Sequence, residues 1–117
     1  MPCAHDFKII KDYPKWQEGV LSKGIDFKDK EFIHVDDDTL SDVMSGVCIK
    51  TINISDRFEP YLGLAWYGIT LIPPESLGEL INGILKNKNH NDSEVIQLLI
   101  LLREAEENNK YVLHCGV

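Results

Sequence analysis

The sequence predicts an α+β domain with a mostly antiparallel sheet, two consecutive C-terminal helices and a closing C-terminal strand. Three observations lead to this fold class. Residues 64–85 read as a β-prone run, a Pro-Pro stop and an amphipathic helix. A second, leucine-rich helical segment covers residues 95–102, and a last β-prone segment covers residues 111–115. Because two helices follow one another without an intervening strand, the order does not fit an alternating, parallel βαβ fold.

The stretch from residue 64 to residue 85 organises this prediction. The strand is expected over 64–72, where Gly68 indicates a bulge or a close approach of another backbone. Neighbours in a strand face opposite ways, so one of Trp66 and Tyr67 should be at the surface. Pro73 and Pro74 end the strand, and Pro74 suits the first helical turn. One apolar stripe is expected on the helix, formed by Leu77, Leu80, Ile81, Ile84 and Leu85.

Shorter elements are predicted before this stretch. The β-prone segments are residues 7–10, 31–35 and 47–55, and residues 56–61 read as a loop containing Pro60. A short helix is expected over residues 38–44, with Asp38 as its N-cap and Gly46 closing it.

The second long helix has its own start and stop signals. Asn91 and Glu94 resemble a capping box, and Asn108 with Asn109 should end the helix. Because every residue of 95–102 except Gln97 is apolar, we expect this helix to be buried on more than one side.

Length and charge limit the classes of function. The 117 residues are expected to form one domain, 1–117. A net charge of −7 gives no basic footprint for direct nucleic-acid binding, and no apolar run is long enough to span a bilayer. The N-terminus lacks the basic and apolar regions of a secretory signal, and three cysteines are an odd number. We therefore expect a cytoplasmic protein.

Cysteine and histidine occur near both ends of the chain, as Cys3 with His5 and as His114 with Cys115. If the terminal strands met, these side chains would offer zinc-type ligands. Their spacing matches no zinc finger or ribbon, and adjacent strand residues point to opposite faces. We therefore expect no metal and no other cofactor, with a frayed N-terminus and an inert, buried cysteine.

The chain contains no motif with an attached catalytic mechanism, so we expect that it is not an enzyme. Cys48 and Cys115 lie in β-prone, apolar surroundings, where a thiol usually serves packing. A small cytoplasmic enzyme with a His/Cys-containing pocket is the alternative. A convergent pocket that holds His34 or His114 beside a perturbed partner would favour it.

Acidic residues gather in the first half of the chain, at Asp36, Asp37, Asp38 and Asp42. This run lacks the glycine and the distal glutamate of an EF-hand loop, so it does not indicate calcium binding. Two interpretations stay open, a solvated surface and a face that attracts a basic partner.

Two segments carry a resemblance to a known class of protein. They are residues 66–77, Trp-Tyr-Gly-Ile-Thr-Leu-Ile-Pro-Pro-Glu-Ser-Leu, and residues 110–117, Lys-Tyr-Val-Leu-His-Cys-Gly-Val. With the two helices between them, they resemble small bacterial immunity proteins, including those paired with the toxic C-terminal domains of contact-dependent growth inhibition systems. The resemblance covers residues 63–117, about half of the chain.

The resemblance implies a non-catalytic cytoplasmic protein that binds and blocks one cognate toxin, commonly a nuclease. A nuclease has a basic substrate groove, and an acidic inhibitor would complement it. The expected toxin-binding residues are Asp36, Asp37, Asp38, Asp42, Asp56, Glu59 and Tyr61. We expect a monomer when no toxin is bound. The further alternative is a structural subunit of a homo-oligomer, with the helix over 95–102 at its interface.

Overall fold

The computed structural model describes residues 4–10, 32–54, 59–87 and 92–116. In these ranges six strands form one sheet in the order β2-β1-β6-β5-β3-β4, and each neighbouring pair is antiparallel. The elements are β1 (Ala4–Ile10), β2 (Ile33–Asp36), α2 (Asp37–Val43), β3 (Lys50–Asn53), β4 (Glu59–Leu62), β5 (Ile69–Ile72), α3 (Pro74–Leu85), α4 (Ser93–Glu107) and β6 (Tyr111–Cys115). The predicted α+β class, the two consecutive helices and the closing strand are confirmed.

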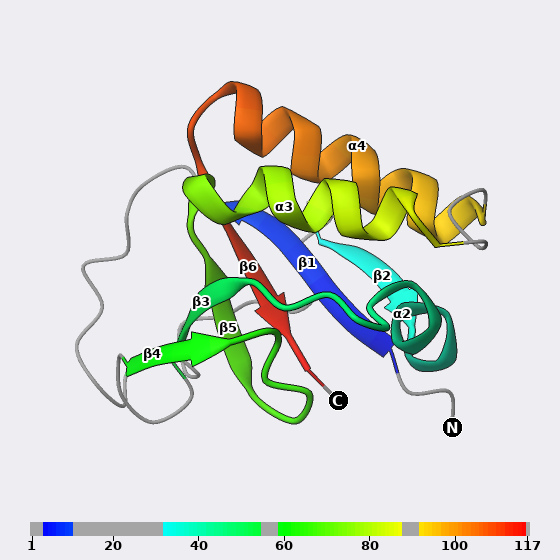
Figure 1. Ribbon diagram of the computed structural model, residues 1–117, viewed down its shortest axis with the longest axis horizontal. Helices are drawn as coiled ribbons and strands as arrows, with labels where there is room; N and C mark the ends of the chain where they lie inside the picture. The colour runs from blue at the N-terminus through cyan, green and yellow to red at the C-terminus, as the bar shows by residue number, and fades with distance from the viewer. Residues whose placement is uncertain (1–3, 11–31, 55–58, 88–91, 117) are drawn as a thin grey trace.

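The two long helices lie side by side along one face of the sheet (Figure 1). The predicted stripe of α3 faces this sheet, with Leu77, Leu80 and Ile84 fully buried, while Leu85 at its end is partly exposed. These side chains form the main core together with apolar residues of α4, α2 and the inner strands. The burial of this stripe stabilises the packing of α3 on the sheet.

A smaller apolar cluster lies on the opposite face of the sheet. It contains Leu71 of β5 and Leu113 and Cys115 of β6, together with Phe32 and Ile54. Val112 belongs to the helix-covered core, so successive β6 residues alternate between the two faces. His114 and Cys115 therefore point to opposite faces, as predicted.

Three predicted strand boundaries were wrong. The strand expected over 64–72 begins only at Ile69, because residues 65–68 form a turn in which the Gly68 N–H donates to the Ala65 carbonyl at 3.0 Å. The strand expected over 47–55 is limited to Lys50–Asn53. The loop expected over 56–61 contains β4, which places Pro60 on an edge strand, where a missing N–H is tolerated.

Neighbouring residues replace two of the predicted helix caps. Asp36, not Asp38, caps α2, and its carboxylate accepts the Asp38 N–H at 3.2 Å. Asp92 caps α4 and accepts the Glu94 N–H at 2.9 Å, whereas Asn91 lies outside the described residues. In each case the capping aspartate directly precedes the first helical residue and has an extended backbone, which a cap requires.

The helix α4 is buried on more than one side, as predicted, because it packs on both α3 and the sheet, but two of its apolar residues face outward. Ile96 and Ile100 are 43% and 62% exposed, while Leu98, Leu101 and Leu102 are buried. Because α4 packs on α3 and on the sheet, the four-residue spacing of the two isoleucines places them on its outer side. Within the described ranges, no helix is long and apolar enough to cross a membrane.

Candidate functional site: a buried histidine network beside an acidic edge

Three polar side chains from adjacent strands meet on the helix-covered face of the sheet. Thr70 of β5 and Phe7 of β1 are both register partners of His114 in β6. His5 lies two residues before Phe7, so it shares this face and is the diagonal neighbour of His114. His5, Thr70 and His114 are fully buried. The expected frayed N-terminus is therefore wrong at His5, because the strand begins before it; Cys3 lies outside the described residues.

Hydrogen bonds join these side chains to α2 and to the 65–68 turn. His5 Nδ1 lies 2.8 Å from His114 Nε2, and His5 Nε2 lies 2.8 Å from Asp37 Oδ1. The same Asp37 oxygen accepts the indole N–H of Trp66 at 2.7 Å. At the other end, His114 Nδ1 lies 3.5 Å from the Thr70 hydroxyl, which accepts the Ala65 N–H at 2.8 Å. We call these five side chains the histidine network: His5, Asp37, Trp66, Thr70 and His114.

The distances fix part of the proton arrangement in the histidine network. The Asp37 carboxylate only accepts, so His5 must carry a proton on Nε2. Only one proton fits between His5 Nδ1 and His114 Nε2, and either ring can supply it. The Thr70 hydroxyl can donate to His114 Nδ1 or accept from it. The negative charge of the network sits on Asp37, at its outer end.

Electrostatics keep His114 neutral in the folded protein. Burial, together with the neighbouring His5, lowers the pKa of His114 to about 3. The hydrogen bond from His5 lowers the pKa of Asp37 and outweighs the opposing effect of desolvation, and the Trp66 N–H lowers this pKa further. His5, His114 and Thr70 are closed off from solvent, and the hydrogen bonds of the network hold α2, the turn, β1 and β6 together.

The predicted acidic residues Asp36, Asp37, Asp38 and Asp42 do lie together, at the end of β2 and along α2. Glu94 joins them from the first turn of α4, where its carboxylate accepts the Asp36 N–H at 3.0 Å. Asp38 and Asp42 are exposed, and the other three are partly buried. We call this group the acidic edge: Asp36, Asp37, Asp38, Asp42 and Glu94.

Two other predicted site residues are not brought to the acidic edge. Glu59 and Tyr61 are on β4, which forms one border of the sheet, while β2 and the acidic edge lie at the other border. Figure 1 shows this separation between β4 and α2. Asp56 lies outside the described residues.

Tyr67 was not among the toxin-binding residues expected from the sequence, which included Tyr61 instead. It is 84% exposed, against 39% for Tyr61, and it sits on the 65–68 turn beside Trp66, which is tied to Asp37. One residue of the Trp66–Tyr67 pair is thus at the surface, as expected, although a turn rather than strand alternation puts it there. The Gly68 that follows was the available signal for a turn.

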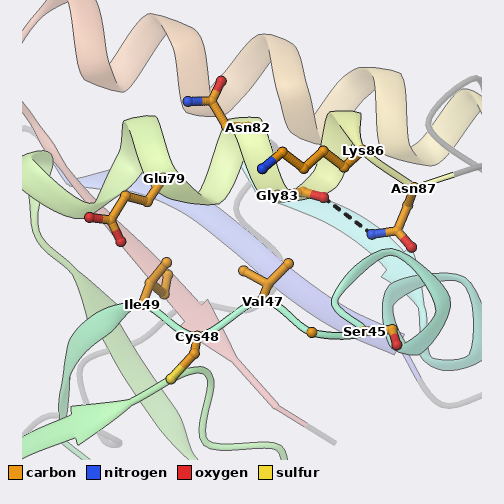
Figure 2. Close-up of a pocket in the computed structure, with 10 residues that line it drawn as sticks. Ser45, Val47, Cys48, Ile49, Glu79, Asn82, Gly83, Lys86 and Asn87 are labelled. Carbon is orange, nitrogen blue, oxygen red and sulfur yellow. Dashed lines mark hydrogen bonds between the residues drawn. The ribbon is translucent and has the colours of Figure 1, made fainter.

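A cleft of about 390 Å³ separates α3 from the segment that leads into β3. Figure 2 shows Glu79, Asn82 and Lys86 of α3 on one side and Val47, Cys48 and Ile49 on the other. The dashed bond joins the Asn87 amide to the Gly83 carbonyl; the same amide also donates to the Val43 carbonyl at 2.7 Å. Asn87 thereby ties the end of α3 to α2.

The remaining cysteine and histidine candidates have ordinary surroundings. None of the histidines that the structure describes lines this cleft or the neighbouring one of about 470 Å³, which shares Cys48 and Glu79 with it. Burial raises the pKa of the Cys115 thiol to about 12, so it is not a thiolate at neutral pH. His34 is largely exposed and pairs with Asp6 at the surface. Among the described residues, no group of three or more His, Cys, Asp or Glu is placed to hold a metal ion.

Comparison with protein-family models, with curated proteins and with solved structures found no match to this chain.

Proposed function

We propose that this protein is an immunity protein that binds and neutralises a cognate toxin domain, with the acidic edge and Tyr67 as its contact surface. The observation that carries the proposal is the gathering of five carboxylates from β2, α2 and α4 at one border of the sheet. The resemblance of residues 66–77 and 110–117 to immunity proteins supports it. In a cell whose growth is stopped by the toxin domain encoded immediately upstream, co-expression of this protein should restore growth.

Charge complementarity argues for a basic partner, and a nuclease domain is the class we propose. The chain has a net charge of −7, and the acidic edge concentrates part of that charge on a surface built from rigid elements. A surface of this kind accelerates association with a basic groove and makes the rate sensitive to salt.

The aspartates of the acidic edge differ in what they do for the fold. Asp36 caps α2, and Asp37 accepts hydrogen bonds from His5 and Trp66. Substituting either residue would disturb the structure as well as the charge. Asp38 and Asp42 are exposed, so they are the better probes of partner binding.

The double substitution Asp38→Asn with Asp42→Asn should slow association with the toxin domain about three- to tenfold at low salt and flatten its salt dependence. Stopped-flow association kinetics at several salt concentrations would measure this. Glu104→Gln with Glu107→Gln is the matched control. It removes the same charge at the other end of α4, about 20 Å from Glu94. Equal slowing by both double variants would show an effect of net charge alone, and no slowing by the first would remove the acidic edge from the interface.

Substituting Tyr67 by alanine should raise the Kd for the toxin domain about 30-fold, because an exposed aromatic on a well-anchored turn has the character of a binding hot spot. Tyr61→Ala on β4 should change the Kd less than threefold. Titration calorimetry on both variants compares the two borders of the sheet. The reverse ranking would move the contact surface to β4, which carries the Tyr61 that the sequence analysis expected to bind the toxin.

The exposed Ile96 and Ile100 favour a second candidate, a structural subunit of a homo-oligomer that pairs through the outer side of α4. Sedimentation over a hundredfold range of protein concentration distinguishes the two. A single monomeric species throughout would contradict the oligomer, and association that Ile100→Glu abolishes would support it.

A further inference from the structure

The histidine network has a property that toxin binding does not use. His5 and His114 face each other through single nitrogen atoms 2.8 Å apart, and only one proton fits between these atoms. If both imidazoles were charged, two N–H groups would point at each other within hydrogen-bonding distance. The closed structure therefore cannot hold a proton on every ring nitrogen of the pair.

The groups around the histidine pair come from α2, β5, β1 and the 65–68 turn. Asp37 of α2 faces His5, and Thr70 of β5 faces His114. The Trp66 ring lies 4.3 Å from the His5 ring, and the Phe7 ring lies 5.0 Å from the His114 ring. Asp37 is the one carboxylate that the described structure places in hydrogen-bond contact with the pair, and its single charge already has His5 and Trp66 as donors.

The backbones that carry the two imidazoles stay together while the sheet is intact, because β1 and β6 are paired over five register positions. On the helix side, His5 is contacted by Asp37 of α2, a helix of 7 residues, and by Trp66 of the 65–68 turn, and the Asp37–Trp66 bond links the two. Lifting this cover would let water and protons reach the pair without breaking a strand pairing.

We propose that the histidine pair makes this end of the molecule acid-sensitive: as the pH falls, α2 and the 65–68 turn open while the sheet, α3 and α4 remain folded. Protons drive the opening because the open form can charge both imidazoles and the closed form cannot. The low pKa of His114 in the closed form is consistent with this direction. The inference is independent of the proposed function and concerns the folded chain alone.

Amide hydrogen exchange on the full chain between pH 7 and pH 5, corrected for the intrinsic pH dependence of exchange, tests the proposal. Protection of residues 40–43 in α2 should fall by about tenfold per pH unit for each proton taken up on opening. Protection at Leu80 in α3 and Leu102 in α4 should follow the free energy of global unfolding measured by urea at the same pH, and protection in α2 at pH 5 should be at least about tenfold lower than theirs. Constant protection in α2, or protection in α2 equal to that in α3 and α4 at pH 5, would overturn the proposal.

His114→Gln keeps a side-chain donor for His5 and removes one titrating ring. The logarithm of the acid-induced loss of protection in α2 should therefore be at most half of its wild-type value. His34→Gln, which removes an exposed imidazole, is the control and should leave the loss unchanged. An equal loss in wild type and His114→Gln would contradict the proposal. If His114→Gln does not fold, imidazole nitrogen NMR of the wild type decides. A His114 that stays neutral in the closed form down to pH 5 supports the proposal, and two independently titrating, ordinary histidines would overturn it.

Discussion

Lowering the pH from 7 to 4 should reduce the free energy of unfolding by about 3 kcal/mol through His114 alone. The pKa of this buried histidine is about 3 in the folded protein, against an ordinary value of 6.5. The unfolded chain therefore takes up a proton at His114 below about pH 6.5, whereas the folded protein does not until the pH approaches 3. Stability rises with pH throughout this window, because the unfolded state binds more protons. The lowered pKa of Asp37 adds a loss in the same direction at the acid end.

Urea unfolding at half-unit pH steps would measure this dependence. The slope should approach about 1.4 kcal/mol per pH unit between pH 6 and pH 4 for one proton. His114→Gln should be less stable than wild type near neutral pH and should show a slope smaller by about one proton. An unchanged slope in this variant would show that His114 is not the titrating group.

Replacing Gly116 by alanine should destabilise the protein by about 3 kcal/mol or more. A Cβ atom at this position would lie 2.2 Å from the backbone oxygen of Trp66 and 2.9 Å from that of Ala65. These are main-chain atoms of the 65–68 turn, so they cannot rotate out of the way. The substitution would also strain the hydrogen bond from the Gly116 N–H to the Gly68 carbonyl, which is 2.7 Å long.

Gly78→Ala is the matched control for this substitution. Its Cβ would meet only the end of the flexible Glu106 side chain, at 2.8 Å, and Gly78 lies inside α3, where alanine is the better helix former by about 1 kcal/mol. Thermal and urea unfolding should therefore show a large loss of stability for Gly116→Ala and a small change or a gain for Gly78→Ala. A Gly116→Ala protein as stable as wild type would contradict the close packing of the C-terminal end against the turn.

The segments with strong local signals were predictable from the sequence. Pro73 and Pro74 mark a strand end and a helix start in any context, and the spacing of Leu77, Leu80 and Ile84 defines one helix face. Strand boundaries were less accurate, because residues 64–72 are β-prone throughout while tertiary hydrogen bonds turn 65–68 away from the sheet. β4 was missed because Pro60 is unfavourable in most strands and acceptable only at an edge.

The site was predictable only where its residues are close in sequence. Asp37, Asp38 and Asp42 share one helix and Asp36 caps it, so their proximity follows from spacing alone. His5 and His114 are 109 residues apart and meet only through the pairing of β1 with β6, a strand order that no local pattern reveals. The grouping of Glu59 and Tyr61 with the aspartates was wrong for the same reason, since the strand order places β4 at the opposite border.

Binding of the purified protein to the toxin domain encoded immediately upstream tests the proposed function most directly, by titration calorimetry at two salt concentrations. The proposal predicts a one-to-one complex with a nanomolar Kd that weakens as salt increases. A tight complex without salt dependence would keep toxin binding and discard the electrostatic role of the acidic edge. No binding at micromolar concentrations would contradict the immunity function itself.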